Sequence, residues 1–238
     1  MRPTSFLVNE RVAVDGGALT STLSIAEQAR LTHVFLTHSH LDHLCTLPFL
    51  ADNVLTLVEE PIGLYGPEDT IRCLEEHLFN DRLWPDFTRI SNGKTVVFRY
   101  QVLPPGETVR VPGLEVTAFP MEHAVPCNGY LLTEPECSVI ICGDTASTRG
   151  LLNILPRAAN LKAIVLEFSF PRRLAGIAAL SKHLSTDSFA REVRRLPAGV
   201  QILVSHCKPG CEDDIREEMR EVGPRNVAFL EQGREYRF

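Results

Sequence analysis

The sequence predicts an α/β protein with mixed β-sheets, and two observations lead to this prediction. Short apolar runs alternate with amphipathic helical segments over much of the 238-residue chain, a pattern typical of strands that are linked by helices. In the middle of the chain, however, five strand-like runs follow one another with Gly and Pro between them, which indicates that not every strand is followed by a helix. No linker divides the chain, so we expect residues 1–238 to form one domain.

The elements follow from hydrophobic periodicity, in chain order. Apolar runs of strand length predict strands, while apolar residues that recur every three or four positions predict helices. In the first third, the expected strands are 11–15, 33–36 and 62–65, and the expected helices are 23–30, 41–50 and 68–79. In the middle, the expected strands are 95–98, 107–111, 114–119, 130–133 and 138–142. In the last third, the expected strands are 163–167, 201–205 and one near 227–230, and the expected helices are 185–196 and 212–222.

Composition narrows the class of protein and its partners. Hydrophobic residues make up 44% and charged residues 23% of the chain, as in soluble globular proteins. No apolar run approaches the ~18 residues of a membrane span, and the N-terminus has no apolar signal segment. The seven cysteines form no CxxC pair, which favours reduced thiols and a cytoplasmic location.

The charge of the chain bears on nucleic acid binding. The formal net charge is −6, and the only basic clusters are the pairs Arg172-Arg173 and Arg194-Arg195. Proteins that bind long nucleic acids usually present a basic face. The sequence therefore argues against long RNA or DNA as a partner and favours a small ligand.

A metal-binding motif follows one of the predicted strands. Residues 37–43 read THSHLDH, directly after the apolar residues 34–36. In an extended segment, residues two apart point the same way, so His38 and His40 can aim at one point. Asp42 and His43 lie at a strand-to-helix turn and can face a second point nearby. Imidazole and carboxylate ligands suit Zn, Fe or Mn, and four such residues at this spacing rarely form an ordinary polar turn.

Three further polar residues occupy the same kind of position. His123 follows the strand 114–119, Asp144 ends the run VIICGD, and His206 ends the run QILVSH. Any one of them alone would more often be structural. Three at strand ends beside the motif predict additional metal ligands. His33 and His77 lie outside this pattern, and we expect them to be ordinary surface histidines.

The pattern as a whole resembles the metallo-β-lactamase-fold hydrolases. These have an HxHxDH motif, a later His, a Gly-Asp pair and a final His after a strand, and the resemblance covers nearly the whole chain. It implies a four-layer αββα sandwich with two mixed β-sheets and a site at one edge of the sheets. It also implies two divalent metal ions, for which Zn is the preferred assignment and Fe or Mn are the alternatives. The first ion would bind His38, His40 and His123, the second would bind Asp42, His43 and His206, and Asp144 would bridge them.

Finer matches indicate one branch of this family. HSHLDHLCTLPFLADN (38–53) resembles the signature of class II cyclic-nucleotide phosphodiesterases, with Thr46 at the usual Gly or Ser position. The segments 75–87, 166–171, 182–192 and 205–210 are also similar to that group and its bacterial relatives. The stretch KHLS further resembles a motif of RNA-maturing endonucleases, in which a Glu and a His form a proton-donating pair. By position, that pair would be Glu167 and His183.

These matches predict a dinuclear phosphodiesterase that hydrolyses a small phosphodiester, most simply a 3′,5′-cyclic nucleotide to its 5′-monophosphate. The two cations would lower the pKa of a shared water to roughly 7, with Asp42 taking part in catalysis as well as in metal binding. His183 would protonate the leaving oxygen and Glu167 would orient it. Other candidate functions are an RNA-processing endonuclease, an esterase or thioesterase, and a metal-free binding protein.

Three residues are weaker candidates for substrate contacts. Trp84 has the ring to stack on a base, although packing is its ordinary role, and Asn80 is as well suited to capping a turn. Lys208 has the charge to face a phosphate, although a solvated loop is the usual setting for such a lysine. We expect no membrane partner. The oligomeric state stays open, with a homodimer as one option.

Overall fold

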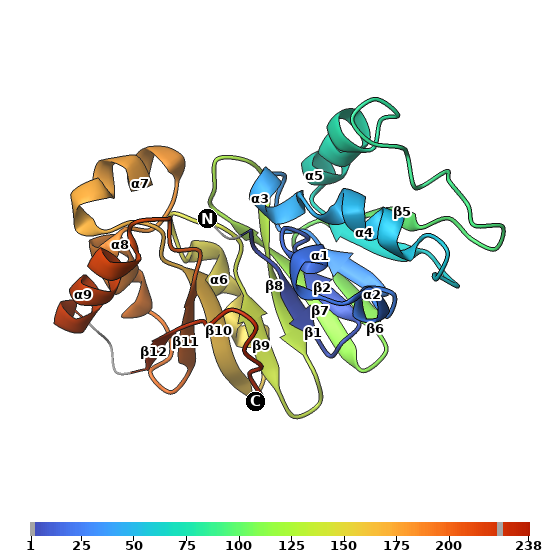
Figure 1. Cartoon of the computed structure of the whole chain (residues 1–238). Coiled ribbons are helices and arrows are strands. Elements are labelled where there is room, and N and C mark those ends of the chain that lie inside the picture. The colour runs from blue at the N-terminus through green and yellow to red at the C-terminus, as the bar shows by residue number, and fades with distance from the viewer. Residues whose placement is uncertain (1–2, 223–225) are drawn as a thin grey trace. The chain divides into compact units, whose positions relative to one another are not determined.

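Two units of the chain, residues 2–104 and residues 105–238, each contain one β-sheet and one hydrophobic core. The structure is a computed structural model, and it describes residues 3–222 and 226–238. Both sheets contain parallel and antiparallel neighbours, which confirms the predicted α/β class with mixed sheets (Figure 1). That the two units act as one domain stays a prediction.

The first unit is built on a five-stranded sheet in the order β1-β2-β3-β4-β5. Strands β1 and β2 are antiparallel, and the later neighbours are parallel. The strands are β1 Phe6–Val8, β2 Val12–Val14, β3 His33–Phe35, β4 Ile62–Gly66 and β5 Phe98–Val102. The helices are α1 Leu19–Thr22, α2 Ile25–Gln28, α3 Leu41–Leu44, α4 Leu47–Val54 and α5 Glu68–Cys73, followed by the π-helix η1 Leu74–Leu78.

The expected helix 41–50 is instead two helices, α3 and α4. The break falls at Cys45 and Thr46, where the backbone N–H of Thr46 donates to the carbonyl of Gly16 at 3.0 Å and its hydroxyl donates to the same carbonyl at 2.7 Å. Pro48 lies in the first turn of α4, where its missing N–H costs nothing, whereas within a continuous helix it would remove a hydrogen bond. The hydrogen bonds at this break therefore connect the segment that follows the metal motif to the residues that follow β2.

The expected strand 95–98 begins later, because the pairing partner sets its position. β5 pairs in parallel with β4 from Phe98 onward, while Val97 is still part of the loop and its N–H donates to the carbonyl of Phe87 at 3.2 Å. The apolar pattern could not distinguish these neighbouring residues. Among the described residues, strand β1 and the helices α1, α6 and α7 were not expected from the sequence.

The second unit is built on a seven-stranded sheet in the order β12-β11-β10-β9-β8-β7-β6. Strands β6 to β9 are antiparallel neighbours, and β9 to β12 are parallel. The strands are β6 Thr108–Val111, β7 Leu114–Met121, β8 Cys127–Thr133, β9 Ser138–Ile141, β10 Leu161–Glu167, β11 Gln201–Ser205 and β12 Val227–Phe229. The helices are α6 Arg149–Ile154, α7 Ala175–Ser181, α8 Thr186–Val193 and α9 Glu212–Val222, and short 3₁₀ turns precede α7 and follow α6.

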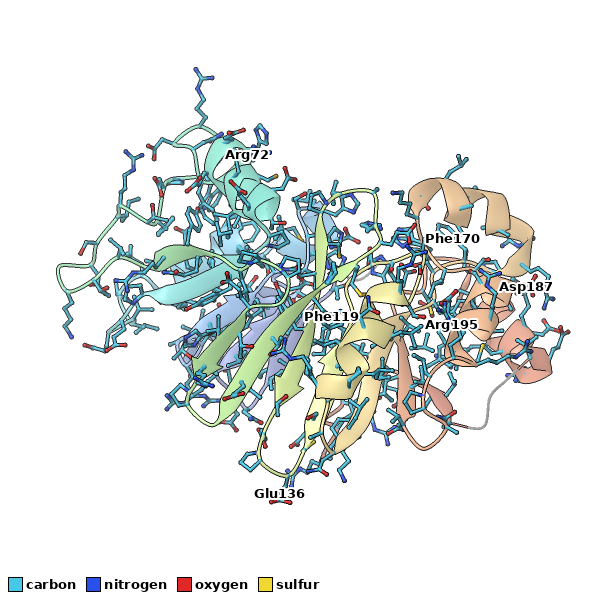
Figure 2. The ribbon with its side chains drawn as sticks, turned by 180° about the vertical axis from the view of Figure 1, so that it is seen from behind. Arg72, Phe119, Glu136, Phe170, Asp187 and Arg195 are labelled. Atoms are coloured by element: carbon cyan, nitrogen blue, oxygen red, sulfur yellow. The ribbon has the colours of Figure 1, made fainter. Side chains whose placement is uncertain are left out.

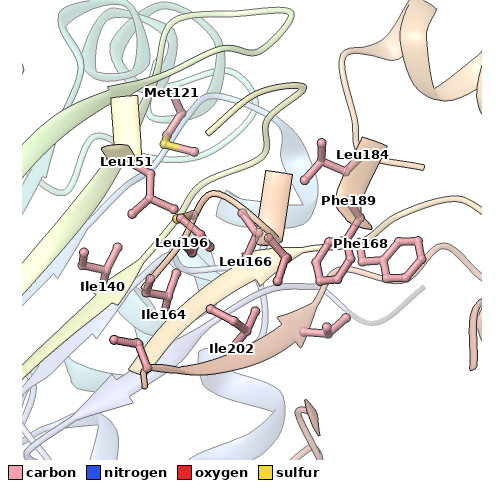
Figure 3. Packing of buried hydrophobic residues seen from close by; sticks show 14 of the residues in the cluster. Met121, Ile140, Leu151, Ile164, Leu166, Phe168, Leu184, Phe189, Leu196 and Ile202 are labelled. Atoms are coloured by element: carbon pink, nitrogen blue, oxygen red, sulfur yellow. The ribbon is translucent and has the colours of Figure 1, made fainter. Parts of the chain in front are cut away.

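The core of the second unit packs α6 and α8 against the sheet. Leu151, Leu166 and Phe189 are fully buried in it (Figure 3). Gly150 allows α6 to approach β7 closely, because a Cβ at this position would lie only 1.7 Å from the carbonyl oxygen of Pro120. The core therefore fixes the ends of β9, β10 and β11, from which the polar residues of this unit extend.

Candidate metal centre and proton donor

The first unit presents its motif residues at the end of β3. His38 and His43 are buried, and the ring of His38 lies 4.6 Å from that of His40 and 4.2 Å from that of His43, measured between centroids. The Nε2 atom of His43 lies 3.9 Å from Oδ2 of Asp42. The structure thus brings together the four motif residues within this unit.

Asp15 holds this group and was not among the predicted site residues. Its carboxylate accepts a hydrogen bond from Nδ1 of His43 at 2.7 Å and another from the backbone N–H of Thr37 at 2.7 Å. The Thr37 hydroxyl contacts the same carboxylate and lies 3.0 Å from Nδ1 of His38. Such carboxylate–histidine pairs fix the ring so that Nε2 is the nitrogen presented to a metal. In the sequence, the position of Asp15 directly after the apolar strand β2 and before Gly16-Gly17 was the feature that could have identified it as a site residue.

Gly17 allows the backbone to pass close to Asp42 and Thr4. A Cβ there would lie 2.0 Å from the carbonyl oxygen of Asp42 and 2.8 Å from the backbone of Thr4. Only glycine fits this position without moving the motif. Asp15 itself has φ of 63°, a left-handed conformation that an Asp tolerates better than most residues.

The second unit carries its polar residues along one edge of its sheet. Strands β9, β10 and β11 are parallel neighbours, so their carboxyl ends meet at the same edge. Asp144 and His206 follow two of these strands, and Oδ2 of Asp144 lies 3.0 Å from Nε2 of His206. His123 follows β7, with its Nε2 3.9 Å from Oδ2 of Asp144. Its Nδ1 lies 3.1 Å from the carbonyl oxygen of Lys182, to which it can donate.

Glu167 and His183 form a buried pair in this unit. Nδ1 of His183 lies 2.8 Å from Oε1 of Glu167, and both residues are more than nine-tenths buried. The Glu167 carboxylate also accepts hydrogen bonds from the N–H of Thr145 at 2.6 Å, the hydroxyl of Ser169 at 2.6 Å and the N–H of Leu184 at 3.2 Å. These donors compensate a buried negative charge. The carboxylate is therefore fixed in place and able to orient the imidazole.

The donor set fits a divalent cation. Ligands that share one tetrahedral Zn at 2.0–2.2 Å lie about 3.3 Å apart, close to the 3.0 Å between Asp144 and His206. Asp144, His183 and His206 offer ligand atoms that all lie within 4.8 Å of one another. His183 can thus approach a metal or donate a proton, and its Nδ1 contact with Glu167 leaves Nε2 for either role.

Two of the backbone positions beside these residues are strained. His206 has φ of 61° and Lys182 has φ of 54°, in the left-handed region that non-glycine residues seldom adopt. Lys182 directly precedes His183 and accepts from His123. Strain of this kind often accompanies functional residues, since the surrounding structure must maintain it.

The three weaker candidates have clear structural contacts. Asn80 caps a turn, because its Oδ1 accepts from the N–H groups of Arg82 and Leu83 at 3.0 and 2.8 Å. Trp84 packs on the core of the first unit with its ring 5.5 Å from that of Phe49. Nζ of Lys208 lies 2.8 Å from Nε2 of His206. Substrate contacts by any of these residues stay predictions.

Cys207 and His33 have ordinary structural roles. Burial raises the pKa of the Cys207 thiol to about 12, so little thiolate is present near pH 7 and the thiol is not a ready nucleophile. His33 is half-buried, rather than on the surface as expected, and stacks on Phe35 and Tyr65. Burial lowers the pKa of His33.

Comparison with known proteins shows the family of the chain. Residues 15–206 match the model of the beta-lactamase superfamily domain. A probable 3′,5′-cyclic-nucleotide phosphodiesterase of Yersinia pestis is 24% identical over 236 aligned positions, which cover 86% of this chain and 67% of that protein. Ribonuclease BN of Cronobacter sakazakii is 31% identical over 112 positions, which cover 47% of this chain and only 34% of that protein.

Solved structures show the same fold. The crystal structure of unliganded yeast PDE1 aligns with a TM-score of 0.74 at 22% identity, covering 88% of this chain and 69% of that one. The chain therefore belongs to the beta-lactamase superfamily. More particularly, it is a metallo-β-lactamase-fold enzyme of the hydrolase class, related to cyclic-nucleotide phosphodiesterases, as the sequence predicted. Within residues 3–222 and 226–238, no helix has the length and apolar character to cross a membrane.

Proposed function

We propose that the protein is a phosphodiesterase that uses two divalent metal ions and opens a 3′,5′-cyclic nucleotide to its 5′-monophosphate. The assignment of ligands follows the family resemblance: His38, His40 and His123 for one ion, Asp42, His43 and His206 for the other, and Asp144 for both. When bound, such ions lower the pKa of a water and neutralise phosphoryl oxygens. The cyclic-nucleotide phosphodiesterase relative supports this substrate class.

The pair of Glu167 and His183 is the observation that carries the proposal. A ribose alkoxide is a poor leaving group, so cleavage of a cyclic nucleotide benefits from a positioned acid. Oε1 of Glu167 lies 2.8 Å from Nδ1 of His183 and orients the ring, which leaves Nε2 for proton transfer. In its protonated form, the ring would pass the proton on Nε2 to the departing oxygen. The neutral ring would then keep its Nδ1–H, hydrogen-bonded to Glu167.

The test compares substrates with poor and good leaving groups. His183→Ala should lose roughly 10²–10⁴-fold in kcat/KM on cyclic AMP, the usual worth of a general acid. It should lose far less on bis-p-nitrophenyl phosphate, because p-nitrophenolate leaves with almost no help. Glu167→Gln should show the same pattern more weakly, since it acts only through the imidazole.

Metal content is measured in each variant as the control. Equal losses on the two substrates would contradict the proton-donor role and point to binding or structure. Loss of metal in His183→Ala would instead identify His183 as a metal ligand. This outcome is included because His183 lies close to Asp144 and His206.

An RNA-processing endonuclease is the second candidate, because the ribonuclease BN relative shares 31% identity over 112 positions. A hydrolysis panel separates the candidates. It contains cyclic AMP, cyclic GMP, a 2′,3′-cyclic nucleotide, a linear dinucleotide and a thioester. Preferential cleavage of 3′,5′-cyclic nucleotides supports the proposal, and preferential cleavage of the dinucleotide or the thioester contradicts it.

A further inference from the structure

A polar hollow of about 340 Å³ lies beside the metal motif, within the first unit. One wall is Ser39, which stands between His38 and His40 in the chain. The other wall is one face of the helix formed by α5 and η1. The lining residues of that wall are Asp69, Arg72, Cys73, Glu76 and His77.

The spacing of these residues shows that the helix divides its two faces sharply. Positions 69, 72, 73, 76 and 77 follow the i, i+3, i+4, i+7, i+8 pattern of a single helix face. Thr70, Ile71 and Leu74 lie on the other face and are buried. The helix changes to π geometry at Leu74, where the N–H of Phe79 donates to the carbonyl of Leu74 at 2.8 Å. Single π turns of this kind recur at functional sites.

The charges of the hollow disfavour a phosphate group and favour a neutral polar ligand. With His77 counted as neutral, the two carboxylates and one guanidinium give the hollow a formal net charge of −1, so a second phosphate would be repelled. A neutral group with several donors and acceptors suits it better. Asp69 already accepts from Nη2 of Arg72 at 2.7 Å and fixes the guanidinium (Figure 2 labels Arg72). Glu76, one turn further on the same face, lies on an exposed part of the wall.

We infer that this hollow is the nucleobase subsite of the enzyme and that it selects guanine. Guanine presents two adjacent acceptors, O6 and N7, which match the fork of a guanidinium. It also presents two adjacent donors, N1–H and N2–H, which match the two oxygens of a carboxylate. Arg72 and Glu76 supply these two groups from adjacent turns. Adenine has no such pair of donors on one edge, so it would leave the Glu76 carboxylate poorly matched.

This inference rests on the proposed function, and binding of nucleosides tests it separately from hydrolysis. Guanosine and adenosine are titrated into the full-length protein by calorimetry. The wild-type protein should bind guanosine roughly 10- to 100-fold more tightly than adenosine, the range of one good bidentate pair. Glu76→Gln should remove most of that preference. Glu75→Gln is the matched control, because it makes the same charge change in the same helix at an exposed residue that does not line the hollow.

The outcomes are distinguishable. No guanosine preference in the wild-type protein, or an equal loss in both variants, would overturn the subsite. Where cyclic nucleotides are substrates, the ratio of kcat/KM for cyclic GMP over cyclic AMP should fall about 10-fold in Glu76→Gln and not in Glu75→Gln. A guanosine preference that depends on Glu76, in a protein that cleaves neither cyclic nucleotide, would support the subsite while contradicting the proposed function.

Discussion

At the residue scale, the candidate site depends on which nitrogen each histidine presents. Nδ1 of His43 contacts Asp15, Nδ1 of His38 contacts the Thr37 hydroxyl, and Nδ1 of His123 contacts a backbone carbonyl. In each ring the second nitrogen, Nε2, is then the natural metal ligand. The motif letters predicted the histidines. They could not predict these partners, because Asp15 lies 28 positions from His43 in the chain.

Asp15 gives the first prediction at this scale. Asp15→Ala should weaken metal binding roughly 10- to 100-fold, the usual effect of removing a carboxylate that orients a ligating histidine. Zinc affinity is measured by competition with a chromophoric chelator, with circular dichroism to check the fold. Asp52→Ala is the control, since Asp52 is an exposed residue of the same unit. Unchanged zinc affinity in folded Asp15→Ala protein would remove Asp15 from the site.

At the scale of elements, strand ends carry the chemistry of both units. Asp144, Glu167 and His206 end or follow the parallel strands β9, β10 and β11, and Asp15 follows β2. Apolar runs that end in a single polar residue predicted two of these four positions, Asp144 and His206, while Glu167 was predicted only through the family resemblance. Helix boundaries were predicted less well, because the break at Thr46 depends on a hydrogen bond to Gly16, a contact that local periodicity does not contain.

In helix α8, the buried carboxylate of Glu192 links the helix to another segment of the second unit. Glu192 accepts from the Thr148 hydroxyl at 2.6 Å and from Arg195 at 2.8 Å (Figure 2 labels Arg195). Burial raises the pKa of Glu192, but the hydrogen bonds from Thr148 and the charge of Arg195 outweigh burial, so its pKa lies below the ordinary value. The ionised carboxylate of Glu192 is therefore more stable in the folded protein than in the unfolded chain.

This pKa shift predicts a pH-dependent effect on stability. A carboxyl whose folded pKa is lowered stabilises the protein above its unfolded pKa of about 4.3, and the contribution is lost as the pH falls through the folded pKa. Glu192→Gln should therefore lower the free energy of unfolding by about 1–3 kcal/mol at pH 7 and by less near pH 4. Urea denaturation at both pH values measures this. The exposed Glu136→Gln serves as control, and an equal effect of Glu192→Gln at both pH values would contradict the explanation.

At the scale of the whole molecule, charge bears most directly on the choice between small and large substrates. The net charge is −6, and three of the four arginines in the two basic pairs noted in the sequence form ion pairs with carboxylates. Arg172 pairs with Asp187 at 3.0 Å, Arg173 with Asp214 at 2.8 Å, and Arg195 with Glu192 at 2.8 Å. The sequence predicted the charge and the family correctly. It could not show which carboxylates pair with Arg172 and Arg173, because Asp187 and Asp214 lie 15 and 41 positions away in the chain.

The protein should therefore bind structured RNA weakly and with little dependence on salt. Each phosphate that a protein neutralises adds roughly −0.9 to the slope of log K against log[salt] on a duplex, so we expect a slope of small magnitude here. Binding of a folded RNA is measured by filter retention between 50 and 500 mM KCl. Asp187→Asn, which frees Arg172 from one of its partners, should raise the affinity slightly and so shows that the assay detects a single charge. Tight binding of the wild-type protein with a steep salt slope would contradict the preference for a small substrate, and it would favour an endonuclease like the ribonuclease BN relative.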